Sequence, residues 1–273
     1  NAAGISVIIT DHHIAPSVLP AAQAILNPNQ PGCGFPSKCI AGVGVTFYLM
    51  LALRGRLRAL GWFEKSGLAE PNLADQLDLV ALGTIADVVP LDRNNRILVD
   101  VGLKRIRKGK TRPGIDALIT VSSREGVRLR ASDVGYGLAP RLNAAGRLED
   151  MSTGIECLLS NSDSDAYQFA LALDGINRDR KKIEADMREQ AWQALNEISA
   201  QDKDLPNALC LFDERWHQGI VGIIASRIKD KYHRPAIAFA QVDEGHEIKG
   251  SARSIKGFHI RDALDIVATK NPG

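Results

Sequence analysis

Three residues with metal-binding side chains directly follow a run of apolar, largely β-branched residues near the start of the chain. The run Ile5–Ile9 leads through Thr10 to Asp11, His12 and His13. A run of this length and composition predicts a buried strand of a parallel sheet. Ligands of open α/β sheets bind beyond the carboxyl ends of the strands, and oxygen and imidazole donors there suit Mn²⁺ or Mg²⁺. A solvated polar turn is the alternative.

A second carboxylate of interest, Asp87, lies in the apolar segment Leu73–Val89, flanked by small and apolar residues. Burying an unpaired charge is costly, so such an aspartate either caps a helix or has a functional role. A metal site built around Asp11 and the two histidines needs further carboxylates. This requirement favours the metal-ligand interpretation of Asp87.

A segment later in the chain suits phosphate recognition. Arg141 and Arg147 flank Asn143 and several small residues, which let a polyanion approach the backbone. The alternative is that the two arginines pair with Glu149 and Asp150.

Two features near the C-terminus also suit phosphate. His217 stands before a helix with isoleucines on one face, where free backbone N–H groups favour an anion. Along Glu247–Ser254, the period of a strand places Lys249, Ser251 and Arg253 on one face. A basic, hydroxyl-bearing face can follow a nucleic-acid backbone. An exposed edge strand protected by charge is the alternative.

The elements expected to position these residues follow from hydrophobic periodicity and turn signals. The residues from 16 to 36 are rich in proline and glycine and predict a connection made of turns. A helix is expected to start at Ser132 as N-cap and to run toward Leu138. Further helices are expected over Ala41–Leu60, Arg93–Arg107, Asp163–Ser199, Gly219–Lys229 and Ile260–Ala268, and strands over Ala208–Phe212, Ala236–Ala240 and Glu247–Ser254. The longest helix would span roughly 55 Å, which predicts a strut between two lobes.

The composition is that of an ordinary globular protein, with 45% hydrophobic and 24% charged residues and a formal net charge of +2. The 273 residues are enough for two domains. No apolar run approaches the ~20 residues of a membrane span, and no signal peptide is visible. The four cysteines lack the close spacing of a zinc site, which predicts free buried thiols in a reducing cytoplasm. They are Cys33, Cys39, Cys157 and Cys210.

The chain starts without an initiating methionine, just before the strand Ile5–Ile9. A single strand cannot form a parallel sheet, so we expect its partners upstream. The sequence therefore predicts an internal piece of a longer protein.

Five blocks in this order resemble the DHH phosphoesterase superfamily. They are Thr10–His13, Gly83–Leu91, Arg141–Arg147, His217–Arg227 and Gly250–Ser254. The last two narrow the resemblance to bacterial single-stranded-DNA-specific exonucleases of the superfamily. The ordered set covers nearly the whole chain and is far more specific than the Asp11-His12-His13 motif alone.

The resemblance implies an α/β fold, with a partial DHH-type parallel-sheet domain joined by a long helix to a partial α/β DHH-associated domain. The expected divisions are residues 1–162, 163–200 and 201–273. The implied activity is 5′→3′ exonucleolytic hydrolysis of single-stranded DNA in recombination and repair, with two Mn²⁺ or Mg²⁺ ions. The implied partners are single-stranded DNA, a single-stranded-DNA-binding protein and a helicase. We expect a cytoplasmic monomer with no membrane contact.

The resemblance also assigns roles to individual residues. Asp11, His12 and Asp87 would be metal ligands, and His13 would be a ligand or contact the scissile phosphate. The residues that would face the DNA backbone are Arg141, Asn143, Arg147, His217, Ser251 and Arg253.

Several motifs of the superfamily are not found in this sequence. They are the aspartate motifs that precede Asp11-His12-His13, a later motif rich in glycine and histidine, and a C-terminal oligonucleotide-binding domain. We therefore expect this polypeptide alone to bind metal poorly and to hydrolyse little DNA. Two alternatives remain: a DHH-family hydrolase of short oligonucleotides, cyclic dinucleotides or pyrophosphate, and a non-catalytic module that binds single-stranded DNA.

Overall fold

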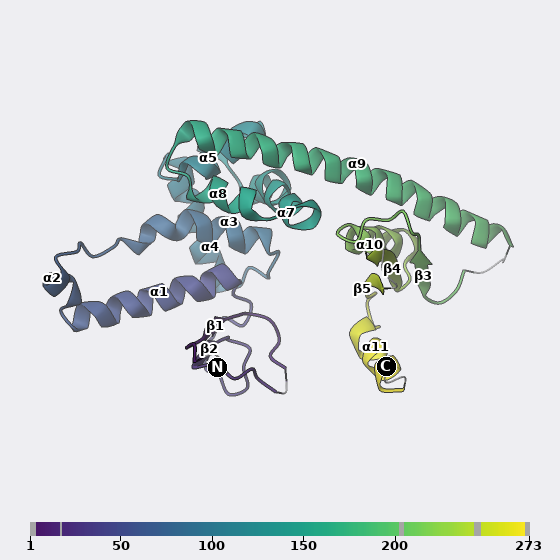
Figure 1. Ribbon diagram of the computed structural model, residues 1–273, viewed down its shortest axis with the longest axis horizontal. Helices are drawn as coiled ribbons and strands as arrows, with labels where there is room; N and C mark the ends of the chain where they lie inside the picture. Colours follow the sequence, from purple (N-terminus) through teal and green to yellow (C-terminus); the bar gives the residue numbers. More distant parts are fainter. Residues whose placement is uncertain (1–3, 17, 202–204, 243–246, 271–273) are drawn as a thin grey trace. The chain divides into compact units, whose positions relative to one another are not determined.

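The computed structural model describes residues 4–16, 18–201, 205–242 and 247–270. The chain forms two compact units (Figure 1). Unit 1 comprises residues 1–143 and 151–174, and unit 2 comprises residues 144–150 and 175–273. The long helix expected from the sequence is confirmed as α9 (Asp163–Gln201), which begins in unit 1 and continues in unit 2.

The strands of unit 1 are short. β1 (Ile8–Thr10) pairs in parallel with β2 (Ala24–Leu26). The expectation of a buried strand over Ile5–Ile9 is wrong in two respects. The strand begins later, and Ile5 and Ile8 are 65% and 61% exposed. In the described part of the chain this sheet has two strands, so β1 is not covered as an inner strand would be.

The parallel partner of β1 in the described residues, β2, lies downstream and was not expected from the sequence, while partners upstream remain a prediction. β2 falls within residues 16–36, where proline and glycine predicted a connection of turns. A three-residue strand between dense turn signals has too few residues to show a period of two.

The helical part of unit 1 follows the strands. Its elements are α1 (Gly42–Ala59), α2 (Trp62–Ser66), the 3₁₀ turn η1 (Leu73–Gln76), α3 (Leu77–Ala86), α4 (Arg93–Arg107), α5 (Pro113–Val121), the 3₁₀ turn η2 (Gly126–Arg128), α6 (Ala131–Asp133), the π-helical turn η3 (Val134–Leu138), α7 (Ala139–Leu148) and α8 (Ser152–Leu159). α7 is shared between the units, since residues 144–148 belong to unit 2. The helices expected over Ala41–Leu60 and Arg93–Arg107 are confirmed.

The helix start expected at Ser132 is wrong. α6 begins at Ala131, and its N-cap residue is Arg130. The side chain of Asp133 accepts a hydrogen bond from the Arg130 backbone N–H at 2.8 Å. A carboxylate that reaches back to the N-cap takes the place of the serine hydroxyl.

Helix α3 is packed between α1 and α4 and is apolar around most of its circumference, with Val80, Ala81 and Leu82 all buried. Glycines permit the close approach on both sides. A Cβ at Gly102 of α4 would lie 2.1 Å from the carbonyl oxygen of Leu77, and one at Gly83 would lie 2.8 Å from a methyl carbon of Val43 in α1. This packing fixes the position of the C-terminal end of α3.

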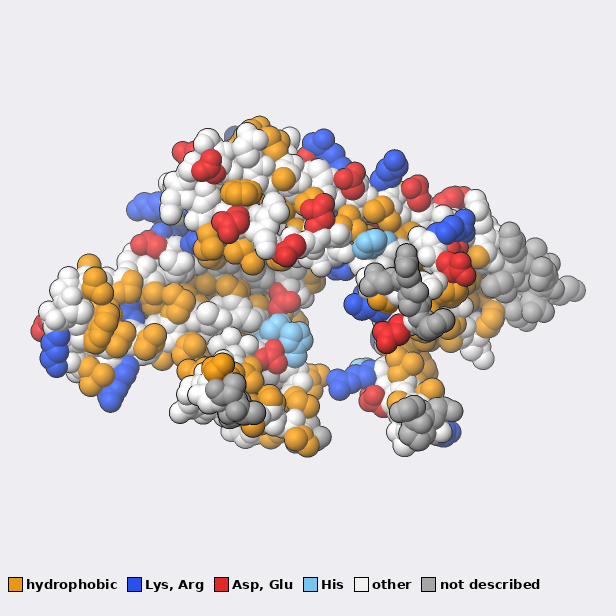
Figure 2. Space-filling model, in the orientation of Figure 1, with side chains coloured by type: hydrophobic (Ala, Val, Ile, Leu, Met, Phe, Trp, Pro, Cys, Tyr) orange, Lys and Arg blue, Asp and Glu red, His pale blue; other side chains and the backbone are white. Residues whose placement is uncertain are grey.

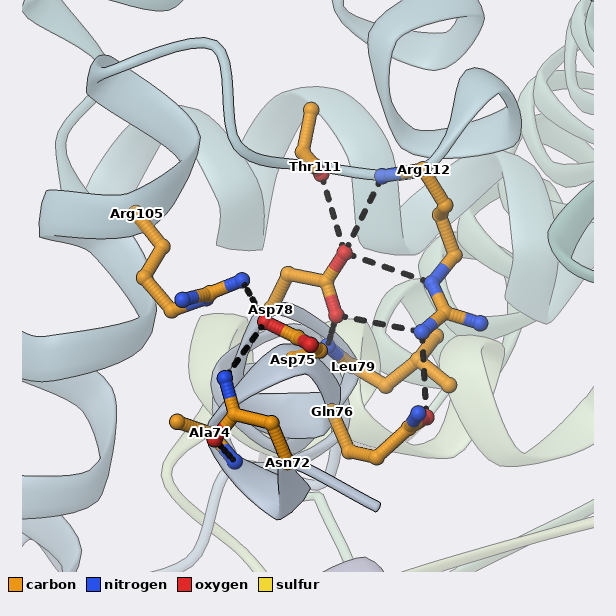
Figure 3. A network of polar contacts seen from close by, with 9 residues as sticks. All are labelled: Asn72, Ala74, Asp75, Gln76, Asp78, Leu79, Arg105, Thr111 and Arg112. Atoms are coloured by element: carbon orange, nitrogen blue, oxygen red, sulfur yellow. Dashed lines mark hydrogen bonds and ion pairs between the residues drawn. The ribbon is translucent and has the colours of Figure 1, made fainter. Parts of the chain in front are cut away.

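The start of α3 is held by a buried carboxylate (Figure 3). Asp78 is 1% exposed. Its Oδ2 accepts hydrogen bonds from the Thr111 hydroxyl at 3.1 Å and from the backbone N–H and the Nε of Arg112 at 3.1 and 3.2 Å. The same guanidinium donates to the Gln76 side chain. The network therefore ties α3 to the start of α5.

Unit 2 contains a mixed sheet. β3 (Leu209–Phe212) pairs in parallel with β4 (Ala236–Val242), and β4 pairs antiparallel with β5 (Glu247–Arg253). Helices α10 (Val221–Tyr232) and α11 (Ile260–Lys270) accompany the sheet. The core includes Ile220, Ile224, Ile228, Ala236, Ala238 and Ala240. The expected strands and the α/β class are confirmed (Figure 1).

The cysteines are free, as expected, but they are not all buried. Cys157 is buried, and burial raises the pKa of its thiol to about 11. Cys210 is exposed, while Cys33 and Cys39 are half-buried. Along the part of the chain that the structure describes, no helix is both long enough and apolar enough to cross a membrane.

We predict that Asp78→Ala lowers the free energy of unfolding by about 3 kcal/mol, because it removes a buried carboxylate and leaves the Thr111 hydroxyl and the backbone and guanidinium N–H groups of Arg112 without their acceptor. Urea unfolding followed by circular dichroism measures the change. Asp75→Ala is the matched control, since Asp75 pairs with Arg105 in the same region but has a side chain that is 55% exposed. Its loss should cost less than about 1 kcal/mol. Equal losses for the two variants would contradict the prediction.

Candidate metal and phosphate sites

Two of the predicted metal ligands meet in unit 1. His12 Nε2 lies 3.3 Å from Asp87 Oδ2, and their side chains are 17% and 37% exposed. Figure 2 shows histidine and acidic side chains side by side in this region of the surface. His12 belongs to the turn after β1, and Asp87 is the C-cap residue of α3. The fold thus brings together an imidazole and a carboxylate that are far apart in the sequence.

Helix packing positions both side chains. The His12 ring lies against Gly42 at the start of α1, where a Cβ would be 3.4 Å from ring atom Cδ2. α1 in turn contacts α3 through Gly83. A side chain at Gly42 would crowd the His12 ring.

A fully buried asparagine links the loop before α1 to the segment that follows Asp87. Asn95 is 0% exposed, and its Nδ2 donates to the carbonyl oxygens of Cys39 at 2.8 Å and of Pro90 at 2.9 Å. The Cys39 carbonyl belongs to the segment that follows the His12 turn, and the Pro90 carbonyl to the segment that follows Asp87. Asn95 therefore fixes one segment against the other.

Asp87 occupies a position that helix stability does not explain. A carboxylate at the C-terminus of a helix faces the negative end of the helix dipole, which is unfavourable. The next residue, Val88, has φ +60° and is 84% exposed. A β-branched residue in the left-handed region is strained, and such strain is concentrated at functional sites. Both observations favour a functional role for Asp87 over the capping alternative.

Asp11 and His13 form a second pair within the turn itself. Asp11 Oδ1 accepts hydrogen bonds from the backbone N–H groups of His12 and His13 at 2.7 and 3.2 Å and lies 2.7 Å from His13 Nδ1. The hydrogen bond with the His13 ring lowers the pKa of Asp11 below its usual range; burial opposes this effect, and the backbone bonds add to it. The side chain of His13 is 78% exposed. In this arrangement Asp11 organises the turn.

The donors present fit part of a metal site. Nitrogen from His12 and oxygen from Asp87 suit Mn²⁺ or Mg²⁺. Among the described residues, no group of three or more His, Cys, Asp or Glu side chains converges on one point. Both ions prefer about six ligands, so His12 and Asp87 supply two donors of a larger set.

A polar groove in unit 2 brings together most of the predicted phosphate-binding residues. It has a volume of about 580 Å³ and is lined by residues 146–149, the turn before α10, the first turn of α10, and β5. The polar side chains that face it include Arg147, Glu149, His217, Lys249, Ser251 and Arg253. Cations outnumber the single carboxylate, so the groove suits an anion.

Two glycines allow the walls of the groove to approach each other closely. A Cβ at Gly219 would lie 2.1 Å from the carbonyl oxygen of Arg147, and one at Gly222 would lie 2.9 Å from Arg253 Nη2 and 3.0 Å from the Ser251 hydroxyl. Any side chain at these positions would displace the groove wall. Gly219 belongs to a motif that the sequence analysis singled out with His217. The close contacts of Gly222 with β5 arise only in the folded protein.

Hydrogen bonds orient the polar groups of the groove. His217 Nδ1 accepts from the Gly219 backbone N–H at 3.1 Å, which places the ring proton on Nε2, where it can be donated. Arg253 Nη1 donates to the Ser251 hydroxyl at 2.9 Å. Arg147 Nη1 donates to the Gly219 carbonyl oxygen at 3.3 Å.

Two of the predicted phosphate contacts, Arg141 and Asn143, lie in unit 1 instead. Arg141 has a 14% exposed side chain and donates to Asp174 at 2.9 Å and to the Gly137 carbonyl oxygen at 2.5 Å. Asp174, rather than the sequence neighbours considered above, is the carboxylate that pairs with it. Asn143 is exposed.

The sequence matches two domains of known families. Residues 1–84 match the N-terminal domain of the DHH family, and residues 205–273 match the DHHA1 domain. The first part of the chain is thus similar to a DHH-family N-terminal domain, and the last part is similar to a DHHA1 domain. The first domain includes the turn with His12, and the second includes β5 and the groove residues of unit 2.

Among characterised relatives, the chain is similar to the single-stranded-DNA-specific exonuclease RecJ of several bacteria. It is 57% identical to that of Dickeya dadantii and 55% identical to that of Escherichia coli, each over 270 residues, or 99% of this chain and 47% of the relative. It is 39% identical to that of Bacillus subtilis over 96% of this chain and 31% of the relative. The chain spans about half the length, or less, of these relatives.

Solved structures agree with this relationship. The chain matches a crystal structure of exonuclease RecJ bound to manganese with a TM-score of 0.73 and 32% identity, over 96% of this chain and 60% of that chain. It matches RecJ of Thermus thermophilus in complex with Mn²⁺ with a TM-score of 0.74 and 31% identity, over 96% of this chain and 36% of that chain. The fold of this chain is thus that of the corresponding part of RecJ.

Proposed function

We propose that this chain forms part of a metal-dependent exonuclease that degrades single-stranded DNA from the 5′ end in recombination and repair. The observation that carries the proposal is the convergence of His12 and Asp87 at 3.3 Å, in a chain that matches DHH and DHHA1 domains and is 55% identical to RecJ of Escherichia coli over 270 residues. The basic groove of unit 2 supports it, because such a groove suits the phosphates of a nucleic-acid backbone. The RecJ structures with Mn²⁺ and Mg²⁺ support the choice of metal.

In this proposal each side chain has a defined task. His12 and Asp87 would hold one divalent ion, and the chemistry that two such ions would supply is activation of a water and stabilisation of the leaving oxygen. The exposed His13 ring, oriented by Asp11, contacts the scissile phosphate. The hydrogen bond from the His13 ring to Asp11 keeps that carboxylate ionised, and so keeps the turn intact.

The groove of unit 2 holds the DNA backbone. Arg147, Lys249 and Arg253 supply positive charge, the Ser251 hydroxyl supplies a neutral donor, and His217 donates from Nε2. Arg141 is engaged by Asp174, and we assign it to the stability of unit 1 rather than to DNA. Asn143 remains a predicted contact.

The other expectations from the sequence remain predictions. The described residues supply two converging metal donors, so the 273-residue chain alone should bind metal weakly and hydrolyse little DNA. The protein partners, the monomeric state, the cytoplasmic location and the domain limits at residues 162 and 200 also remain predictions.

We predict that Asp87→Asn, introduced into the full-length protein, lowers the Mn²⁺-dependent release of nucleotides from a 5′-ended single strand by at least about a hundredfold, because one metal donor loses its charge. Binding of the same strand should stay within about twofold, since the groove of unit 2 is untouched. Asp100→Asn is the matched control, because Asp100 is an exposed aspartate of α4 that pairs with Lys104.

Four outcomes separate the candidate functions. Loss of cleavage with binding retained supports the nuclease. Unchanged cleavage in Asp87→Asn would contradict the metal-ligand assignment. A wild-type protein that binds single strands but releases nothing would be a non-catalytic module, and one that hydrolyses only dinucleotides would be a small-phosphate hydrolase of the same family.

We predict that Arg253→Ala weakens binding of single-stranded DNA uniformly across sequences. The slope of log K against log salt should become shallower by about 0.7, the contribution of one phosphate contact on a single strand. Fluorescence anisotropy at several salt concentrations measures the slope. Arg215→Ala is the control, since Arg215 is an exposed arginine of unit 2 that pairs with Asp213 outside the groove. An equal change in both variants would show non-specific charge attraction instead.

A further inference from the structure

Two asparagine amides hold the backbone of the turn that carries the histidines. Asn29 Nδ2 donates to the carbonyl oxygen of His12 at 2.7 Å. Asn27 Nδ2 donates to the carbonyl oxygen of His13 at 2.9 Å and lies 3.5 Å from Asp11 Oδ2. Each histidine of the turn therefore has its own amide donor.

The orientation of both amides is determined by their other partners. Asn27 is 6% exposed, and its Oδ1 accepts the backbone N–H of Asn29 at 2.9 Å. Its NH₂ group must then face His13, which fixes the assignment of oxygen and nitrogen. Asn29 Nδ2 also reaches the Lys38 carbonyl oxygen at 3.2 Å. These contacts determine where the NH₂ group of each side chain lies.

The loop that carries the asparagines is itself anchored. Lys38 Nζ donates to the carbonyl oxygens of Pro28 and Cys33, both at 2.6 Å. The neighbouring Ser37 hydroxyl donates to Asp92 Oδ2 at 2.6 Å, and Asp92 is the N-cap residue of α4. The amides are thus supported by a helix of unit 1 rather than by a free loop.

The turn needs this support because the sheet does not supply it. β1 ends at Thr10, and its pairing with β2 extends only to the hydrogen bond from the Asp11 N–H to the Leu26 carbonyl oxygen at 3.0 Å. Beyond that bond the backbone of His12 and His13 has left the sheet. A displacement of about 1 Å at a reacting group can cost a factor of a hundred in rate.

We propose that Asn27 and Asn29 are positioning residues for the reaction: Asn29 holds His12 toward Asp87, and Asn27 holds His13 and Asp11. The proposal rests on the proposed function for its reference to metal and DNA. The hydrogen bonds themselves are independent of it. From the sequence, Asn27 and Asn29 are predicted only to form turns. Their spacing gives no indication of a contact with the histidines.

Replacing each asparagine by aspartate, which has the same shape, tests whether the hydrogen bond donated by its NH₂ group matters or only the space that the side chain fills. Asn27→Asp and Asn29→Asp keep the size of the side chain and its acceptor oxygen but remove the NH₂ donor. If the asparagines only fill space, both variants should behave like the wild type and better than the alanine variants. If they position the turn, the aspartate variants should be at least as impaired as alanine, because a carboxylate then faces a carbonyl oxygen.

We expect Asn29→Asp and Asn29→Ala to weaken Mn²⁺ binding by the full-length protein by about 10- to 100-fold, as for other residues that orient a metal ligand. Asn27→Asp should lower kcat on single-stranded DNA about as strongly, with KM unchanged. Gln30→Ala is the matched control. Gln30 lies in the same loop; its Nε2 donates to the carbonyl oxygens of Ile25 in β2 at 2.8 Å and of Asn27 at 3.4 Å and does not reach the histidines.

A second readout needs neither metal nor activity. In the metal-free protein, ¹⁵N correlation spectra of the imidazoles should show shifted His13 ring signals in Asn27→Asp and shifted His12 ring signals in Asn29→Asp, with both unchanged in Gln30→Ala. Wild-type ring signals and wild-type Mn²⁺ affinity in the aspartate variants would overturn the proposal. If the wild-type protein binds no Mn²⁺ and releases no nucleotides, the proposed function fails, while the ring signals still decide the role of the asparagines.

Discussion

The 3.3 Å approach of His12 to Asp87 is the interaction on which the proposed metal site of unit 1 depends. The two side chains come from a turn after a strand and from the end of a helix, so the fold must fix both segments. Asn95 contributes by donating to the carbonyl oxygen of Cys39, in the loop before α1, and to that of Pro90, three residues after Asp87. Buried carbonyls need partners, and an amide that serves two of them locks their relative position. The Oδ1 of Asn95 has no partner among the described residues, which is a cost of this arrangement.

The groove of unit 2 depends on a different constraint, the absence of side chains. Gly219 and Gly222 allow the backbone near Arg147 and the side chains of β5 to approach closely. The two units thus use different means: buried polar contacts position His12 and Asp87, and missing side chains let the walls of the groove approach each other.

Much of this could be predicted from the sequence, because the signals are local. The periodicity of Arg93–Arg107 and the length of α9 gave helices that the structure confirms. The functional importance of His12 and Asp87 followed from polar residues placed at the ends of apolar segments, and the structure brings those two together. The face formed by Ser251 and Arg253 followed from the period of a strand, and both residues line the groove.

The features that could not be predicted depend on tertiary contacts. β2 is three residues long and is formed by pairing with β1 rather than by its own composition. Arg141 carried the same signal as Arg147, yet the fold gives it Asp174 as a partner. Asn27 has the composition of a turn residue, and its contact to His13 exists only in the folded loop.

The central claim is that His12 and Asp87 bind one metal ion together, while His13 does not. Electron spin echo envelope modulation of Mn²⁺ bound to the full-length protein detects a directly coordinated ¹⁴N nucleus. The account predicts a histidine nitrogen signal that disappears in His12→Ala and persists in His13→Ala. A signal that survives in His12→Ala, or that is lost only in His13→Ala, would contradict it.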